Sequence, residues 1–91
     1  MTNWITILAL STVLLPAFAL AAPVNVNTAD AETISEALQG VGLSKARAIV
    51  EYRQKHGPFR SPDDLSLVKG IGERTVVLNR ENILVAPAGK P

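Results

Sequence analysis

The sequence contains no cysteine and only one histidine, His56. Without thiols the chain forms no disulfide, and it lacks the thiolate that many metal sites and nucleophilic enzymes use. One imidazole with no cysteine partner is a poor basis for a metal centre. We therefore expect no bound metal and no cofactor. We expect His56 to lie at the end of a helix, where a cation interacts favourably with the helix dipole.

Charge is also missing from the start of the chain, where no charged side chain precedes Asp30. The segment Trp4–Ala22 is almost wholly apolar, and its Ala19-Leu20-Ala21 end fits the small-x-small pattern of signal-peptide cleavage sites. We expect residues 1–21 to be a secretory signal peptide that is cleaved after Ala21, which makes the remaining chain periplasmic or secreted. An uncleaved membrane anchor is the alternative, because the first residues carry no Lys or Arg and roughly 20 apolar residues suffice to span a bilayer.

The remaining chain is small for a domain without disulfides, so its core is marginal and depends on short-range helix packing. We expect the folded domain to cover residues 22–86 and residues 87–91 to form a disordered tail. Residues 23–44 carry three acids and no base, whereas residues 45–80 carry eight bases and four acids. By itself, a modest basic excess is weak evidence for a nucleic-acid partner.

Apolar spacing and helix-terminating residues predict four short helices. Asp30 is the predicted N-cap of the first helix, and Gly40 ends it. Ser61 and Pro62 begin the third helix as a capping residue and a first-turn proline. Phe59 is the predicted aromatic anchor of the core. The predicted helices cover residues 31–39, 44–56, 62–68 and 73–82, with an extended lead-in at 24–28 and a closing segment at 83–85.

A Gly-aliphatic-Gly turn occurs twice, because Gly40-Val41-Gly42 returns 30 residues later as Gly70-Ile71-Gly72. One helix pair cannot bury its own apolar face, whereas two pairs can bury theirs against each other. We therefore expect an all-α fold of four short helices with pseudo-twofold symmetry. Asn79 breaks the repeat, since the first copy has Ile49 at that position. Its side chain faces either a hydrogen-bond partner or the surface.

Each turn has the features of an anion site. The first glycine lets the chain leave a helix with positive φ, the aliphatic residue points inward, and the second glycine leaves the backbone open to close approach. The helix that follows presents unpaired N–H groups and the positive end of its dipole. Nearby polar side chains add charge-assisted contacts. The candidate phosphate-binding residues are Gly40, Val41, Gly42, Ser44, Lys45 and Arg47 in the first copy, and Lys69, Gly70, Ile71, Gly72, Arg74 and Thr75 in the second.

Two anion sites related by a twofold axis match phosphates on the two strands of a duplex. Because no side chain needs to enter a groove, sequence preference is expected to be weak. Double-stranded DNA is therefore the expected partner, and we expect no small-molecule substrate.

Several motifs in this order resemble one known family. They are Val24-Asn25-Val26-Asn27-Thr28-Ala29, Leu38-x-Gly40-Val41-Gly42-x-x-Lys45-Ala46, Tyr52-Arg53, His56-Gly57-Pro58-Phe59, Asp64-Leu65 and Val68-Lys69-Gly70-Ile71-Gly72-x-Arg74-Thr75. Together they resemble the helix-hairpin-helix domain of the ComEA family of competence proteins. The resemblance implies a tandem helix-hairpin-helix fold and non-sequence-specific binding of double-stranded DNA during uptake of transforming DNA. It also implies a soluble periplasmic domain behind a cleaved leader, with the DNA-uptake machinery at the inner membrane as a further partner.

A DNA glycosylase and a protein-interaction module are the two alternatives to DNA binding. DNA glycosylases contain similar hairpins, but those with a Schiff-base lysine place it two residues after the second glycine, where this chain has Ser44 and Arg74. Asp63 and Asp64 are explained as first-turn helix residues, so we expect no catalytic residues and no enzyme activity. An exported interaction module that has lost DNA binding stays open. It predicts acidic replacements beside the hairpins, of which Glu73 is the one example.

Overall fold

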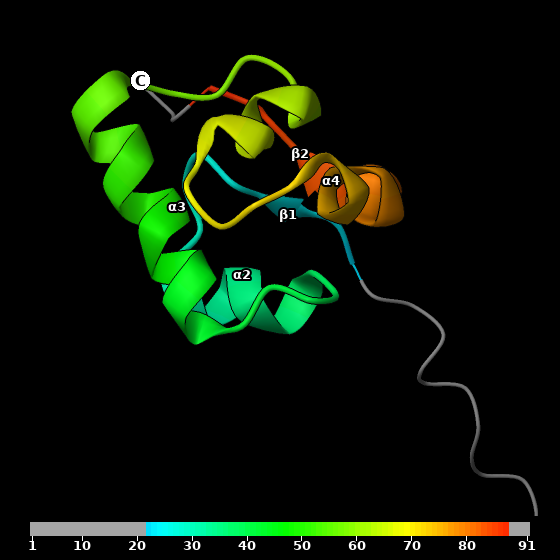
Figure 1. Cartoon of the computed structure of the whole chain (residues 1–91). Coiled ribbons are helices and arrows are strands. Elements are labelled where there is room, and N and C mark those ends of the chain that lie inside the picture. Colours follow the sequence, from blue (N-terminus) through cyan, green and yellow to red (C-terminus); the bar gives the residue numbers. More distant parts are fainter. Residues whose placement is uncertain (1–21, 88–91) are drawn as a thin grey trace, which may run out of the picture.

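The computed structural model describes residues 22–87, so the predicted signal peptide and residues 88–91 of the predicted tail lie outside the described residues. Figure 1 shows α3 along one side of the molecule and α4 on the opposite side. No helix in the described range has the length and apolar character needed to cross a membrane. The elements are β1 (Val24–Asn25), α2 (Ala31–Ala37), α3 (Leu43–His56), η2 (Pro62–Leu67), α4 (Glu73–Asn79), η3 (Arg80–Asn82) and β2 (Ile83–Leu84), where η marks a 3-10 helix.

The four predicted helices are present, with different ends. The Asp30 carboxylate accepts a hydrogen bond from the Thr33 N–H at 2.9 Å, which confirms the predicted N-cap of α2. The helix ends at Ala37 rather than Gln39, because Leu38 takes an extended conformation with φ −110° and ψ 126°. The predicted fourth helix is split into α4 and the 3-10 turn η3.

The third helix differs most from its prediction, because it is a 3-10 helix. Ser61 occupies its N-cap position but its side chain makes no cap hydrogen bond, so the prediction of a capping serine is wrong. The Asp64 carboxylate accepts a hydrogen bond from the Arg60 N–H at 3.0 Å, which lies before the N-cap position and does not cap the helix. Pro62 lies in the first turn as predicted.

A short parallel pairing qualifies the all-α prediction. Val24 of β1 lies beside Ile83 of β2, and Asn25 lies beside Leu84. Figure 1 shows these strands next to each other although they come from opposite ends of the described chain. The predicted lead-in and closing segment therefore hydrogen-bond to each other and close the domain.

The core contains apolar residues from both repeats and from β1 and β2. Phe59 is buried as predicted and stacks on Tyr52, with ring centroids 5.4 Å apart. Tyr52 in turn stacks on His56 at the end of α3, at 4.1 Å. The buried hydrophobic residues are Val24, Val26, Ile34, Leu38, Val41, Ala46, Ile49, Phe59, Leu65, Val68, Ile71, Val76 and Ile83.

Two polar side chains hold the lead-in against the rest of the domain. Asn27 accepts a hydrogen bond from the Phe59 N–H at 2.7 Å and donates to the carbonyls of Phe59 at 3.0 Å and Ala86 at 3.1 Å. Arg53 of α3 donates to the carbonyls of Val26 at 2.8 Å and Ala29 at 2.7 Å. Sequence reasoning assigned neither side chain a role.

Candidate functional site

The structure contains two glycine hairpins, named here hairpin 1 (residues 39–42) and hairpin 2 (residues 69–72). The first glycines, Gly40 and Gly70, have φ of 78° and 94°. Side chains rarely adopt this left-handed conformation, so glycine is required at both positions. The repeat predicted from the sequence is therefore also a repeat of backbone geometry.

The aliphatic residue of each hairpin is anchored in the core. Val41 is 3% exposed and Ile71 is 4% exposed. The Val41 N–H donates to the Leu38 carbonyl at 3.3 Å, and the Ile71 N–H donates to the Val68 carbonyl at 3.0 Å. Val41 and Ile71 are therefore buried beneath the hairpin surface, where they hold the hairpin backbone in place.

The second glycine of each hairpin is exposed, and nothing inside the described chain requires it to be glycine. Gly42 and Gly72 have φ of −76° and −95°, which any residue adopts. A Cβ atom added at either position would meet no heavy atom within 4 Å. Each second glycine therefore leaves the hairpin backbone open to the outside of the molecule.

The helices after the hairpins begin without a side-chain cap. Gly42 is the N-cap of α3 and Gly72 is the N-cap of α4, and neither position has a side-chain cap hydrogen bond. By contrast, α2 is capped by the Asp30 carboxylate. No side chain therefore caps the first turns of α3 and α4, and the helix dipoles favour an anion there. In α4 the Thr75 N–H already donates to the Gly72 carbonyl at 3.1 Å.

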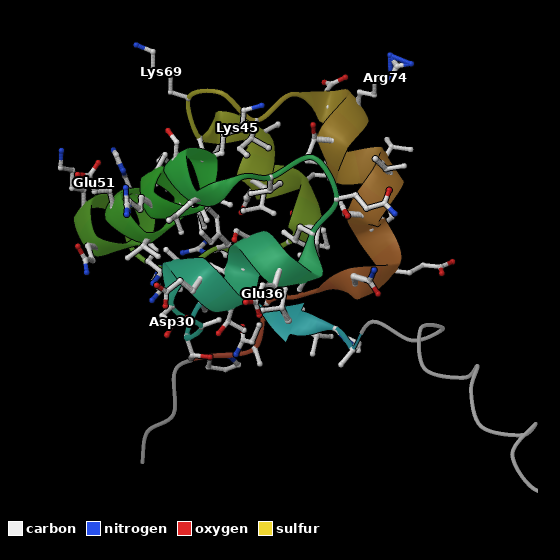
Figure 2. All side chains as sticks on the ribbon, turned by 90° about the horizontal axis from the view of Figure 1, so that it is seen from below. Asp30, Glu36, Lys45, Glu51, Lys69 and Arg74 are labelled. Carbon is white, nitrogen blue, oxygen red and sulfur yellow. The ribbon has the colours of Figure 1, made fainter. Side chains whose placement is uncertain are left out.

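Three predicted cations lie on the side of the molecule that carries the hairpins. Figure 2 shows Lys45, Lys69 and Arg74 pointing outward on that side. The stem of Lys45 crosses from α3 to hairpin 2, since a Cβ on Gly70 would lie 3.7 Å from Lys45 Cγ and 3.9 Å from Lys45 Cε. The ammonium group of Lys45 can therefore serve an anion at either hairpin.

The structure separates Arg47 from Lys45. Both are exposed on α3, but two residues correspond to about 200° around a helix. Ser44 and Arg47 are three residues apart and share one side of the helix. Thr75 is half-buried in the first turn of α4. The predicted residues thus form a group around Lys45, Lys69 and Arg74, with Arg47 flanking the start of α3.

The acidic side chains differ in their position relative to the hairpins. Figure 2 shows Asp30 on the opposite side of the molecule. Glu36 lines the same hollow as hairpin 1, and Glu73 directly follows hairpin 2 in the first turn of α4. The hydrogen bond from the Thr33 backbone N–H, with a second from the Thr33 side chain, lowers the pKa of Asp30. This carboxylate is therefore engaged in capping α2 and is remote from the hairpins.

Two of the basic residues interact with other groups of the domain itself. Burial lowers the pKa of the Arg53 guanidinium, which bonds to the lead-in carbonyls. Arg80 pairs with Asp63 at 2.7 Å, and this is the only salt bridge within residues 22–87. The cations that are predicted to contact phosphate are thus not held in ion pairs within residues 22–87.

The side chain of Asn79, for which the sequence left two environments open, is buried beside hairpin 1. Its side chain is 2% exposed. Its Oδ1 accepts from the Gln39 N–H at 2.7 Å, and its Nδ2 donates to the carbonyls of Gln39 and Thr75, both at 2.9 Å. Of the two open alternatives, the hydrogen-bond partner is thus correct. The one signal in the sequence was the break in the repeat.

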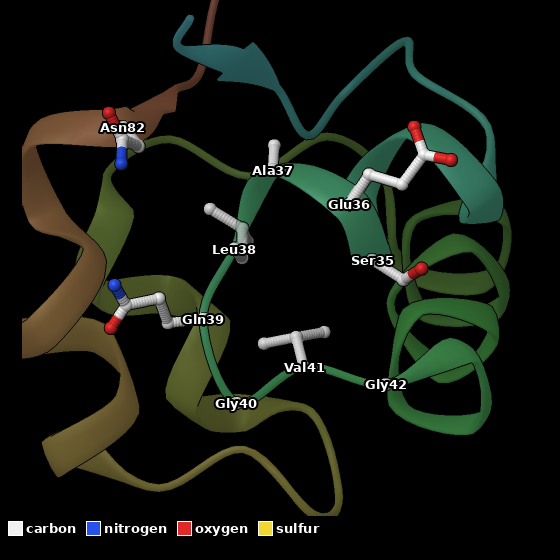
Figure 3. A pocket seen from close by; sticks show the side chains of 9 residues that line it. All are labelled: Ser35, Glu36, Ala37, Leu38, Gln39, Gly40, Val41, Gly42 and Asn82. Atoms are coloured by element: carbon white, nitrogen blue, oxygen red, sulfur yellow. The ribbon is translucent and has the colours of Figure 1, made fainter. Parts of the chain in front are cut away.

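An open hollow of about 620 Å³ lies beside hairpin 1. Figure 3 shows Gln39, Gly40 and Val41 along one side of it and Asn82 across from them. Within residues 22–87, no group of His, Cys, Asp and Glu side chains could hold a metal ion. The polar side chains that line the hollow are Ser35, Glu36, Gln39 and Asn82.

Two glycine hairpins with buried aliphatic anchors, each between two helices, define a tandem helix-hairpin-helix domain. Residues 21–84 match the family model described as the helix-hairpin-helix motif, and the chain belongs to this family.

Among individual proteins, the chain is 42% identical over 62 residues to ComE operon protein 1 of Bacillus subtilis, which confirms the resemblance to the ComEA family. That match covers 68% of this chain and 30% of the relative. An uncharacterized protein of Haemophilus influenzae is 48% identical over 60 residues, covering 66% of this chain and 54% of the relative.

A third relative carries the name of an enzyme family. The chain is 40% identical over 65 residues to the human endonuclease/exonuclease/phosphatase family domain-containing protein 1. This match covers 71% of the chain but only 11% of the human protein. The chain spans at most 54% of these three relatives, so the likeness concerns their helix-hairpin-helix segment.

Proposed function

We propose that the protein binds the phosphate backbone of double-stranded DNA without reading base sequence, and that it acts by binding and not by catalysis. The observation that carries the proposal is the second glycine of each hairpin. Gly42 and Gly72 are required neither by φ nor by packing, and a Ser or Asp there would cap the helix better. A phosphate that approaches the bare amides explains why both positions lack a side chain.

The arrangement of charge supports the same function. Lys45, Lys69 and Arg74 point outward on the side of the hairpins, while Asp30 lies on the opposite side (Figure 2). Two acids lie near the hairpins, because Glu36 lines the hollow beside hairpin 1 and Glu73 follows Gly72. Contacts from backbone amides and from Lys or Arg to phosphates fix orientation on a duplex but carry no base information. Binding is therefore expected on duplexes of any sequence.

A salt series on several unrelated duplexes tests the proposal. We expect a Kd on the order of 10⁻⁴–10⁻⁶ M at physiological salt, as for non-specific binding. If each hairpin neutralises about two phosphates, the slope of log K against log salt is about −3.6. Gel mobility shifts or fluorescence anisotropy give both quantities. No binding at low salt, or binding confined to one of the duplexes, would exclude this function.

The cellular role follows from the resemblance to the ComEA family and from the apolar N-terminal segment. We propose that the protein acts in the periplasm, after cleavage behind Ala21, in the uptake of transforming DNA. Deletion of the gene should lower uptake of labelled duplex DNA, and the wild-type gene should restore it. The protein isolated from the periplasmic fraction should begin at Ala22. Unchanged uptake would remove the competence role and leave DNA binding untouched.

One observation favours an interaction module as a second candidate. Val77 and Leu78 of α4 are 65% and 60% exposed, where the first repeat has Arg47 and Ala48. Exposed apolar neighbours are a feature of protein contact sites. The salt series separates the candidates, because an interaction module does not bind duplex DNA at low salt.

A further inference from the structure

The side chain of Asn79 links the second repeat to the backbone of hairpin 1. It bonds both to the N–H and to the carbonyl of Gln39, the residue directly before Gly40. These bonds join positions that are 40 residues apart in the sequence. One buried amide from α4 therefore fixes two successive peptide groups at the start of hairpin 1.

Among the residues that the structure describes, the first repeat has no equivalent hydrogen-bonding side chain that reaches hairpin 2. The residue of the first repeat that corresponds to Asn79 is Ile49, a fully buried side chain without a polar group. The residue of the second repeat that corresponds to Gln39 is Lys69. Hairpin 2 is instead approached by the aliphatic part of the Lys45 side chain, which lies beside Gly70. Each hairpin is thus contacted by the other repeat, but within residues 22–87 only hairpin 1 is held by hydrogen bonds to a side chain.

The Asn79 amide also explains where α2 ends. The last carbonyls and the turn that follows a helix need partners from outside the helix. Because the Asn79 side chain takes the Gln39 N–H, this group is not part of α2, and the chain turns into Gly40 with φ of 78°. The conformation of hairpin 1 therefore depends on α4 being docked.

We propose that Asn79 is a positioning residue, whose side-chain amide holds hairpin 1 in the conformation that grips a phosphate. The proposal rests on the proposed DNA binding and adds to it that the grip of the first repeat is set by the second. Asn79 itself touches no DNA. Its loss weakens hairpin 1 and leaves hairpin 2 intact.

The test compares Asn79→Ile with Asn82→Ile in the full mature domain. Isoleucine is the residue of the first repeat at this position, so Asn79→Ile is expected to fold. Asn82 lies across the hollow from Gln39 (Figure 3), and its side chain makes no hydrogen bond in the described part of the chain, so it controls for an added apolar side chain beside hairpin 1. Amide NMR spectra, hydrogen exchange and the salt series are measured on each protein.

In Asn79→Ile we expect the amide signals of hairpin 1 to shift or broaden while those of hairpin 2 stay in place. Exchange of the Gln39 N–H should rise at least about tenfold, because its hydrogen-bond acceptor is gone. The salt slope should fall from about −3.6 toward about −1.8, since the contacts of one hairpin are weakened. Asn82→Ile should match the wild type in all three. A folded Asn79→Ile protein with wild-type hairpin signals or a wild-type slope would overturn the proposal.

The wild-type protein provides a measurement that does not depend on the folding of a variant. The Gln39 N–H should be protected from exchange, and adding duplex DNA should slow its exchange further, because DNA selects the closed hairpin. Exchange at the rate of an unstructured amide would overturn the role of Asn79. If the wild type binds no DNA at any salt, the proposed function fails, and the NMR comparison still reports whether Asn79 holds hairpin 1.

Discussion

Three polar side chains satisfy backbone groups that the helices and strands leave without partners. Asn27 and Asn79 use both ends of their amides, and Arg53 donates to two carbonyls. Buried backbone groups without a partner are costly, so each of these side chains stabilises a loop that could not otherwise be packed. Their partners lie 24 to 59 residues away, except for one bond within α4. Patterns between sequence neighbours do not reveal such pairs, which is why Asn27 and Arg53 were not predicted.

Replacing Arg53 by methionine separates this structural role from DNA binding. Arg53→Met keeps the apolar stem but removes both hydrogen bonds to the lead-in, so the free energy of unfolding should fall by about 2–3 kcal/mol. Arg47→Met is the matched control on the same helix, where an exposed change should alter stability by less than about 0.5 kcal/mol. Urea unfolding measures both.

For DNA affinity the order should be reversed. The folded Arg47→Met protein should bind duplex DNA more weakly than the folded Arg53→Met protein. Arg47→Met removes a predicted phosphate contact, whereas Arg53 is occupied by the Val26 and Ala29 carbonyls. Equal stability losses from both variants would show that the lead-in does not depend on Arg53.

At the scale of elements, the signals for the helices and hairpins are local and were read correctly. Glycine spacing predicts both hairpins, and Asp30 predicts the start of α2. The errors have non-local or competing causes. Beyond the end of α2 the Gln39 N–H donates to Asn79 of the other repeat, and η2 lacks the side-chain cap that was predicted at Ser61. The pairing of β1 with β2 joins the two ends of the domain, and no local pattern announces such a pairing.

The cap of α2 should make part of the stability depend on pH. Hydrogen bonds from Thr33 lower the pKa of Asp30 in the folded protein below the ordinary value of 3.8. A carboxyl with a lowered pKa stabilises the fold above its unfolded-state pKa, and this contribution is lost as the pH falls through the folded-state value. Asp30→Asn keeps a capping side chain without a titrating charge.

We therefore expect the stability of the wild type relative to Asp30→Asn to be constant at neutral pH and to decline below about pH 4. Urea unfolding of both proteins along a pH series measures this difference. A difference that stays constant down to acidic pH would show that the charge of Asp30 does not contribute to the cap.

At the scale of the whole molecule, the net charge of +1 does not show that the positive charges gather on one face. The face with the hairpins carries Lys45, Lys69 and Arg74, and the opposite face carries Asp30 (Figure 2). Glu73 directly follows hairpin 2 and reduces this separation of charge. Such a distribution orients the domain in the field of a polyanion before contact. The basic excess along the sequence indicated this only in part, because Arg53 and Arg80 are used within the domain.

The candidate site was predictable to the extent that it is built from local backbone. The glycine hairpins and their buried aliphatic residues follow from the repeat, whereas the position of each cation depends on packing. Lys45 reaches the hairpin of the other repeat, and Arg47 points away from it. Helical spacing places Lys45 and Arg47 on different sides of the helix, but which side meets hairpin 2 follows only from the docked helices.

The central claim, that bare backbone amides after Gly42 and Gly72 grip phosphates, is tested most directly by the double variant Gly42→Ser, Gly72→Ser. Serine fits the backbone at both positions and is a preferred helix N-cap, so the domain should be as stable as the wild type or more stable. Each new side chain also occupies the open space and accepts from the first-turn N–H groups. Duplex affinity by fluorescence anisotropy at low salt should then fall at least about tenfold. A folded double variant that binds DNA as the wild type does would contradict the account.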